Sequence, residues 1–372
     1  MGTLSKKVFR TIDNIPAKAA KTKFKIGENI AIVKKRKIYN KVKWTAEQTA
    51  EFNDYWKKWG GVKPYWHKLY QSINGVFNVK YFPEKLYSTK LEPMLNPWIY
   101  SKVFSDKNMI DLFWGNVEGV NIPRRILSKM NTSYYDGEGN YVSLNKAVEI
   151  VNDIGKCIIK PTVDSSSGQG VKLLNFVNGV DELSGESAKS LIERRNDSFV
   201  VQEIVENNKN IREIHPNSLN TIRVITYKVE EEIHCAPLTL RIGVGDSTVD
   251  NIHAGGLCVG INKDGTLKKK AYQLGWGDSS RYFLKHPTSG IVFKDYYIGN
   301  MRQVIDAAKR LHEKATQLGI VSWDLTINKN EQVVLIEANC YGQSVWFPQV
   351  INGQSLFGDD TEYFLEKIAK NK

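Results

Sequence analysis

The stretch 322–342 reads SWDLTINKNEQVVLIEANCYG, and it places two carboxylates and an amide inside runs that otherwise resemble buried strands. Two alternating runs flank the turn-rich segment NKNEQ: Trp323, Leu325 and Ile327 alternate with Asp324 and Thr326, and Val334, Ile336 and Ala338 alternate with Leu335, Glu337 and Asn339. Successive side chains of a strand point to opposite faces, so this pattern predicts a β-hairpin. One face is apolar, and the other holds Asp324, Glu337 and Asn339.

The chemistry suggested by this polar face is metal binding. With a four-residue loop, Asp324 lies directly across from Glu337, and two carboxylates that close repel each other unless a cation lies between them. Oxygen ligands with no His or Cys among them suit Mg²⁺ or Mn²⁺ better than zinc, and Mg²⁺ commonly keeps waters and a nucleotide phosphate as ligands. The alternative is a solvated hairpin face with ordinary surface acids.

A second segment, KCIIKPTVDSSSGQGVKLLNF, suggests phosphate binding. Lys160 ends an apolar strand, and the loop that follows is built of small residues, namely Ser165, Ser166, Ser167, Gly168 and Gly170. Such a loop exposes backbone N–H groups that can fold over phosphates. It joins two strands, whereas a Walker loop or a dinucleotide fingerprint opens a helix, and a protein kinase has its glycine loop before its strand lysine. The alternative is a flexible hairpin with a surface lysine.

Further polar residues interrupt apolar strands downstream. In VVQEIVE, Gln202, Glu203 and Ile204 suit a segment whose backbone meets adenine while a carboxylate binds the ribose hydroxyls. Two arginines and an amide follow in strand-like or glycine-rich contexts: Arg223, Arg241 and Asn251. A buried arginine needs an anionic partner, and its forked donors fit phosphate or carboxylate best.

The elements that must position these residues mix strands and helices without regular βαβ alternation, which predicts an α+β protein. Strand-like runs cover 156–161, 171–176, 198–205, 220–229 and 232–244. Helices are expected at 45–60, where Thr45 and Gln48 form a capping box, and at 106–113, 144–154 and 185–195. A long amphipathic helix is expected from Met301 to Leu318, ended by Gly319.

The composition of the 372-residue chain is that of a globular protein, with 41% hydrophobic and 25% charged residues. No apolar run approaches the length of a membrane span, and MGTLSKKVFR lacks the apolar stretch of a secretory signal. The four cysteines stand singly, which leads us to expect a reduced, cytoplasmic setting. Neither a CxxC pair nor a close His pair occurs, so a zinc site is not expected.

The net charge of +12 is concentrated at the N-terminus. Residues 1–45 hold 13 Lys and Arg against Asp13 and Glu28, a balance of +11, so the other 327 residues carry only +1. We expect a basic arm that lies on anionic lipid, at the inner membrane face, or on an acidic polymer, and that binds nucleic acid at most nonspecifically. The alternative is a solvated tail.

Taken in order, Lys160, the SSSGQG loop, the VQE segment, NTIR, R-x9-N-x3-GG and the WD…IEAN hairpin resemble the ATP-grasp superfamily, most closely its sugar-transfer-associated family. The resemblance runs from about Leu91 to the end. It implies two α+β subdomains that clasp ATP, with a basic helical N-terminal extension. We therefore expect an arm at 1–45, a helical or α+β region at 46–128, a lid subdomain at 129–205 and a catalytic subdomain at 206–372.

The resemblance also implies roles for individual residues. ATP would be bound by Lys107, Lys160, Ser165, Ser166, Ser167, Gly168, Gly170, Gln202, Glu203 and Ile204. Asp324, Glu337 and Asn339 would hold Mg²⁺ or Mn²⁺. Arg241 and Asn251 match positions near the γ-phosphate and the acyl group, with Arg223 beside them.

The reaction implied is an ATP-dependent joining of a carboxylate to an amine through an acylphosphate. The partners suggested by the family are an acidic or lipid-linked saccharide, such as a cell-surface polysaccharide precursor. Two alternatives stay open at this point: a kinase of a sugar or inositol, which this fold also supports, and a noncatalytic glycan-binding protein that keeps the fold.

Overall fold

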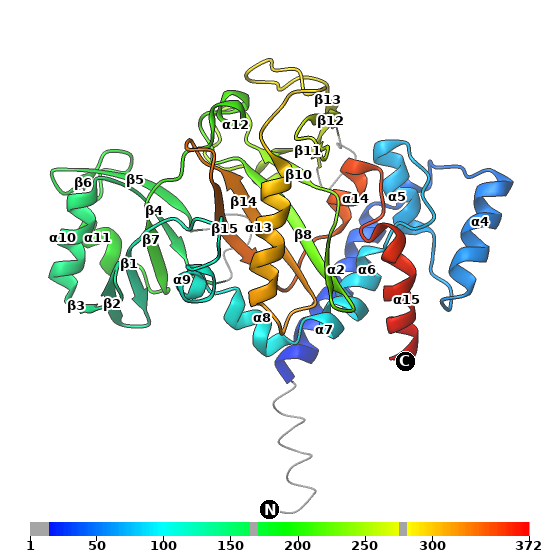
Figure 1. The fold of residues 1–372 in the computed structure, drawn as a ribbon, viewed down its shortest axis with the longest axis horizontal. Coiled ribbons are helices and arrows are strands. Elements are labelled where there is room, and N and C mark those ends of the chain that lie inside the picture. Colours follow the sequence, from blue (N-terminus) through cyan, green and yellow to red (C-terminus); the bar gives the residue numbers. More distant parts are fainter. Residues whose placement is uncertain (1–14, 164–169, 275–280, 372) are drawn as a thin grey trace, which may run out of the picture.

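The computed structural model describes residues 15–163, 170–274 and 281–371, and it contains two antiparallel sheets that lie side by side (Figure 1). The predicted α+β class is confirmed, because every strand pair within the two sheets is antiparallel and the helices pack around them. The segment 164–169, which contains Ser165, Ser166, Ser167 and Gly168, lies outside the described residues.

The smaller sheet, which we call the lid sheet, has seven strands in the order β3-β2-β1-β7-β4-β5-β6. Their bounds are β1 Arg125–Met130, β2 Ser133–Asp136, β3 Tyr141–Val142, β4 Lys156–Pro161, β5 Lys172–Val177, β6 Val180–Asp181 and β7 Phe199–Gln202. Helices α10 (Leu144–Ile154) and α11 (Ala188–Glu193) share its apolar core. The side chain of Ser143 caps α10, so this helix spans the predicted residues.

The larger sheet has eight strands, in the order β13-β12-β11-β10-β8-β14-β15 with β9 also paired to β8. Their bounds are β8 Thr221–Val229, β9 Glu232–Cys235, β10 Thr239–Ile242, β11 Leu257–Ile261, β12 Leu267–Gln273, β13 Arg281–Phe283, β14 Ile320–Ile327 and β15 Val333–Asn339. Strand β14 is buried along its whole length because it lies between β8 and β15. Helix α13 (Met301–Lys314) packs across these central strands (Figure 1).

The predicted strand 232–244 is interrupted. Cys235 pairs with Thr226 of β8, and Thr239 pairs with Arg223 of the same strand. Two β8 residues therefore face the three residues 236–238, which is a β-bulge. Pro237 has no N–H to donate to the sheet, which explains why the strand breaks there.

The hairpin of β14 and β15 has the predicted pairing of Asp324 with Glu337, but it reaches this register by a different route. Its loop, 328–332, has five residues, and alone it would set Asp324 opposite Ile336. A bulge after Asp324 shifts the register by one residue. The predicted faces of two β15 residues were consequently wrong: Leu335 packs in the core opposite Leu325, and Ile336 lines a cleft.

Helix α13 ends earlier than predicted. Its last residue is Lys314, and Ala315 leaves the helical conformation with φ −97° and ψ 60°. Ala315 and Leu318 are still buried in the same core, so the apolar period continued past the helix end. The signal was misleading because tight turns can bury apolar residues at the spacing of a helix.

The described part of the N-terminal segment is helical and packed, which differs from a loose arm. It contains α2 (Ile15–Lys34) and α3 (Arg36–Tyr39). Ala31 and Ile32 are buried, and the ring of Phe24 lies 5.7 Å from that of Tyr341. The alternative of a solvated tail is therefore wrong for these residues, whereas the basic helical extension implied by the resemblance is present.

The remaining helices surround the larger sheet: α4 Ala46–Lys57, α5 Tyr65–Asn74, α6 Glu84–Leu86, η1 Tyr87–Leu91, α7 Glu92–Leu95, α8 Trp98–Phe104, η2 Lys107–Met109, α9 Ile110–Trp114, α12 Lys209–Ile214, η4 Ile252–Ala254, α14 Trp346–Asn352, η5 Gly358–Asp360 and α15 Thr361–Lys370. The predicted capping box of Thr45 and Gln48 is present at the start of α4. Among the described residues, no helix combines the length and apolarity needed to cross a bilayer.

Candidate active site

A cleft of about 1170 Å³ lies between the two sheets and gathers most of the predicted site residues. Those that line it are Lys107, Lys160, Gln202, Glu203, Ile204, Arg223, Arg241, Asn251, Asp324, Glu337 and Asn339. Gly170 does not line it; its carbonyl accepts a hydrogen bond from Arg195 and its φ is +75°. Residues more than 200 positions apart in the sequence thus share one concave surface, as expected of a ligand site.

Asp324 occupies the floor of the cleft between two arginines. Its Oδ1 accepts from Arg223 Nε at 2.5 Å, and its Oδ2 accepts from Arg241 Nη2 at 3.0 Å. Burial alone would raise the pKa of Asp324, but the two guanidinium groups outweigh it and lower the pKa below its usual value. The carboxyl is therefore ionised at neutral pH.

Arg241 is itself fixed by a second carboxylate. Its Nη2 donates to Thr221 Oγ1 at 2.7 Å, and its Nε lies 3.5 Å from Asp250 Oδ2. Asp250 Oδ2 in turn accepts from the backbone N–H of Thr221 at 3.0 Å. Burial opposes the charge of Arg241, but Asp250 and Asp324 raise its pKa further above its usual value. Positive and negative groups therefore alternate in a row, in the order Asp250, Arg241, Asp324 and Arg223.

Glu337 faces a different cation. Lys107 Nζ lies 2.8 Å from Glu337 Oε1, and the backbone N–H of Lys107 donates to Thr162 O, just past the end of β4, at 2.9 Å. Lys107 therefore links the lid sheet to the carboxylate hairpin. The sequence suggested Lys107 as a site residue only through a loose spacing. The structure shows its specific partner, Glu337.

These ion pairs weaken the argument that Asp324 and Glu337 need a metal ion between them. The repulsion between Asp324 and Glu337 is offset by Arg223, Arg241 and Lys107, so the carboxylate pair alone does not require a divalent cation. Among the described residues, no group of three or more His, Cys, Asp or Glu side chains could form a metal site.

The donor set nevertheless fits Mg²⁺. That ion is commonly held by one or two carboxylates together with waters and substrate phosphates, so a large carboxylate cluster is not needed. Glu337 and Asn339 are only partly buried and line the cleft. The Nδ2 of Asn339 donates a hydrogen bond to Ser322 O at 3.3 Å, so the amide oxygen of Asn339 points away from Ser322.

Lys160 lies in the lid sheet and is nearly buried, with its backbone paired to Val200. Burial lowers the pKa of Lys160 to about 8, and the charge of Lys107 acts in the same direction while Glu337 opposes it. Because burial disfavours the charged form of Lys160, an anion that enters the cleft would stabilise its ammonium group. The position fits the predicted phosphate contact.

The end of β7 forms another part of the cleft wall. Gln202 is buried, and its Oε1 has no hydrogen-bond partner among the described residues. Glu203 accepts from the backbone N–H of Arg124 at 3.0 Å, and Ile204 is partly exposed. The amide oxygen of Gln202 can accept a hydrogen bond from a ligand such as a nucleobase amine.

Sequence reasoning missed the residues that hold the segment 341–347 against the cleft. Glu92 Oε1 accepts from the backbone N–H of Gln343 at 3.0 Å, and Glu84 accepts from that of Val345. Burial raises the pKa of Glu92 to about 8. No sequence signal marks these two acids as buried, because they occur in short helices at ordinary positions.

The missed cleft residues also include Thr221, Asp250 and, from α2, Ala20, Lys23 and Phe24.

The sequence profile described as "Sugar-transfer associated ATP-grasp" matches residues 86–363. The chain belongs to this family. The match covers both sheets, and it includes every described residue of the predicted site. The family identified from the sequence motifs is thus confirmed. No curated protein sequence matches the chain.

Solved structures with a similar fold are distant ATP-grasp proteins and ligases. VanG D-Ala:D-Ser ligase from Enterococcus faecalis has a TM-score of 0.42 and 14% identity, covering 74% of this chain and 63% of that one. D-alanyl-alanine synthetase A from Vibrio cholerae has a TM-score of 0.40 and 13% identity, covering 72% and 65%. The chain spans less than two thirds of the length of each.

Proposed function

We propose that this ATP-grasp protein is an ATP- and Mg²⁺-dependent ligase that joins a carboxylate to an amine. The observation that carries the proposal is the arrangement of Arg223, Arg241, Asp324 and Glu337 on one wall of the cleft, with Lys160 on the lid side. Fixed cations around a cleft suit phosphoryl transfer, in which positioning and charge stabilisation provide most of the catalysis.

In the proposed reaction, an oxygen of the substrate carboxylate attacks the γ-phosphorus of ATP and ADP leaves. The amine nitrogen then attacks the acyl carbon of the acylphosphate, inorganic phosphate leaves and a proton is released. Lys160 binds phosphate oxygens of ATP, and Arg241 stabilises the charge on the transferred group. Asp324 keeps both arginines in place, which is a positioning role. The end of β7 receives the nucleoside.

Glu337 and Asn339, together with Asp324, would hold Mg²⁺, which neutralises phosphate charge when bound. Asn251 is assigned a place near the acyl group, because it lines the cleft next to Asp250. We assign the loop 165–170 to the phosphates of ATP from its sequence motif alone, since 165–169 lie outside the described residues. The division at residues 45, 128 and 205 stays a proposal, although the first strand of the lid sheet begins at Arg125.

The substrate class we propose is a saccharide, such as a cell-surface polysaccharide precursor that carries an acidic group or a lipid. The family description supports a role in sugar transfer. Trp98, Tyr341 and Trp346 line the cleft, and aromatic rings of this kind suit sugar faces. We place the reaction in the cytoplasm, at the inner face of a membrane, because the basic residues before position 46 would attract anionic lipid.

The test uses hydroxylamine as the trapping amine. The protein is incubated with Mg-ATP, hydroxylamine and acidic saccharides, including uronic-acid oligosaccharides, and hydroxamate and phosphate are measured. A ligase yields a hydroxamate and one phosphate per ADP, and Glu337→Gln yields neither. If phosphate remains on the saccharide, the protein is a kinase; if Mg-ATP binds but no substrate in the panel causes turnover while an unaltered saccharide binds, the noncatalytic alternative holds.

A further inference from the structure

Helix α2 carries an exposed apolar stripe on the face that points away from the protein. Ile15, Ile26, Ile30 and Val33 are 55%, 54%, 50% and 67% exposed, and their separations of 11, 4 and 3 residues place them on one side of a helix with 3.6 residues per turn. The opposite side holds Phe24, Ala31 and Ile32, which pack on the protein. The helix is therefore apolar on two faces, and only one of them is covered.

Lysines flank the exposed stripe. Helical spacing places Lys18 and Lys25 along one edge and Lys23 and Lys34 along the other, and all four are exposed. The acidic residue of α2, Glu28, lies on the packed side near Lys35. The outer surface of this helix thus presents these four apolar side chains, with the smaller Ala19 and Thr22 between Ile15 and Ile26, and it is positive on both margins.

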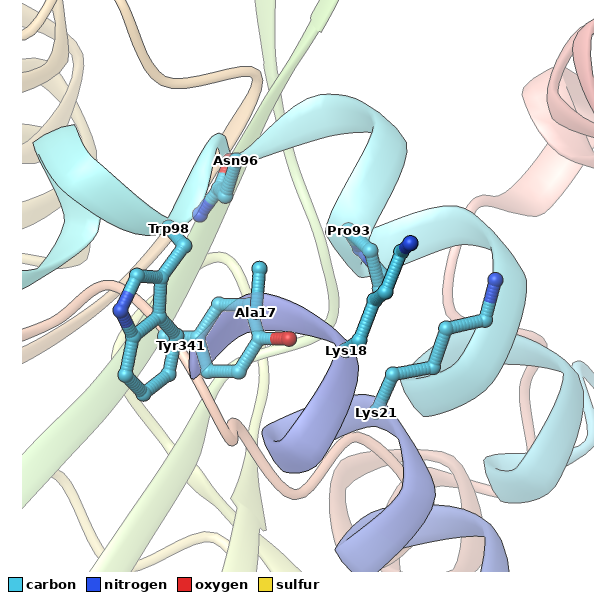
Figure 2. A pocket seen from close by; sticks show the side chains of 7 residues that line it. All are labelled: Ala17, Lys18, Lys21, Pro93, Asn96, Trp98 and Tyr341. Atoms are coloured by element: carbon cyan, nitrogen blue, oxygen red, sulfur yellow. The ribbon is translucent and has the colours of Figure 1, made fainter. Parts of the chain in front are cut away.

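A small pocket of about 170 Å³ adjoins the first half of α2. Figure 2 shows the side chains of Lys18 and Lys21 extending from the helix, with the rings of Trp98 and Tyr341 next to Ala17. Tryptophan and tyrosine beside lysines are typical of surfaces that meet the boundary between water and lipid. The pocket therefore lies between α2 and the neighbouring α8, and only Lys18 belongs both to its lining and to the edge of the stripe.

We propose that α2 docks on an anionic phospholipid bilayer, with its stripe of Ile15, Ile26, Ile30 and Val33 at the acyl boundary and its lysines on lipid phosphates. An amphipathic helix with lysines beside its apolar face lies in the membrane plane in this way. The charge balance of +11 before position 46 complements anionic lipid. This differs from a purely electrostatic arm, since it adds apolar contact from a packed helix.

Docking through α2 would also orient the cleft. Ala20, Lys23 and Phe24 of the same helix line the cleft, so it opens beside the docked surface. A saccharide anchored in the bilayer by a lipid would then be held next to the cleft. This consequence rests on the proposed ligase function, whereas the docking itself does not.

The test is flotation of the full chain with vesicles of phosphatidylcholine alone or with 30% phosphatidylglycerol (about one anionic lipid in three, a composition chosen to give a strong surface charge). We expect binding to the anionic vesicles and at least tenfold less to phosphatidylcholine. Ile26→Asp with Ile30→Asp should reduce binding about tenfold or more. Replacing Lys18, Lys25 and Lys34 by Gln should weaken binding and reduce its salt dependence.

Val177→Asp, at a comparably exposed apolar residue of the lid sheet, is the matched control and should bind as the unchanged chain does. Unchanged binding of the Ile26 and Ile30 variant, with circular dichroism showing a folded protein, would overturn the proposal. So would absence of binding to anionic vesicles, with or without binding to an oligonucleotide or a protein. The assay contains no ATP or saccharide, so its outcome is separate from that of the hydroxylamine assay.

Discussion

Asp324→Asn should destabilise the protein far more than Glu337→Gln, although the two residues face each other in one hairpin. The Asp324 side chain is 5% exposed and accepts three hydrogen bonds from two guanidinium groups. Removing its charge leaves Arg223 and Arg241 with less buried compensation, and losing one partner of a buried ion pair costs about 3–5 kcal/mol. Glu337 is 30% exposed and contacts one lysine, Lys107, whose side chain is 4% exposed, so its substitution should cost less than that of Asp324, about 1–2 kcal/mol.

The assay is equilibrium unfolding in urea, followed by the fluorescence of the tryptophans, among which Trp323 is buried next to Asp324. The free energy of unfolding should fall by about 3–5 kcal/mol for Asp324→Asn. Equal losses for the two variants, or a loss below about 1 kcal/mol for Asp324→Asn, would refute the view that the arginines depend on Asp324. Glu337→Gln should still abolish Mg²⁺-dependent turnover, and near-normal turnover would contradict its proposed role as a ligand.

Four further substitutions, in three experiments, address other parts of the structure. Lys160→Ala should weaken ATP binding measured by calorimetry by about 1.5–3 kcal/mol, because a charge-assisted phosphate contact is lost. Glu92→Gln should remove a pH dependence: the pKa of Glu92 is raised from 4.5 to about 8 in the folded protein, so its contribution to stability is full below about pH 4.5 and is lost as the pH rises toward 8, on the order of 5 kcal/mol. Ile32→Ala should lower the unfolding free energy by about 2–4 kcal/mol, and Ile26→Ala by less than about 0.5 kcal/mol.

A specific outcome would contradict each of these predictions. Unchanged nucleotide affinity of Lys160→Ala would move the phosphate site elsewhere in the cleft. If Glu92→Gln loses stability between pH 5 and pH 8 as steeply as the unchanged protein, the buried carboxyl is not the group that titrates. Equal effects of the Ile32 and Ile26 substitutions would mean that α2 does not pack on the domain.

Local patterns in the sequence predicted much of the fold. The capping box at Thr45 and the strand 156–161 depend on neighbouring residues, and the structure has them where they were expected. Six motifs in the order typical of the family identified it, because each is a short segment that can be recognised from its residue types alone. Polar side chains that interrupt apolar strands indicated most of the described site residues, the resemblance to the family added Lys107, and all of them except Gly170 line the cleft.

What the sequence determined by itself was the alternation of the hairpin, its pair of carboxylates and the excess of positive charge at the N-terminus. The tertiary structure decided which cation meets each carboxylate: Arg223 and Arg241 reach Asp324 from β8 and β10, and Lys107 reaches Glu337 across 230 positions. It also decided the bulge that places Leu335 in the core, and the packing of α2. Periodicity and charge are local properties of a chain, whereas the partner of a buried charge depends on strands that meet only when the sheet forms.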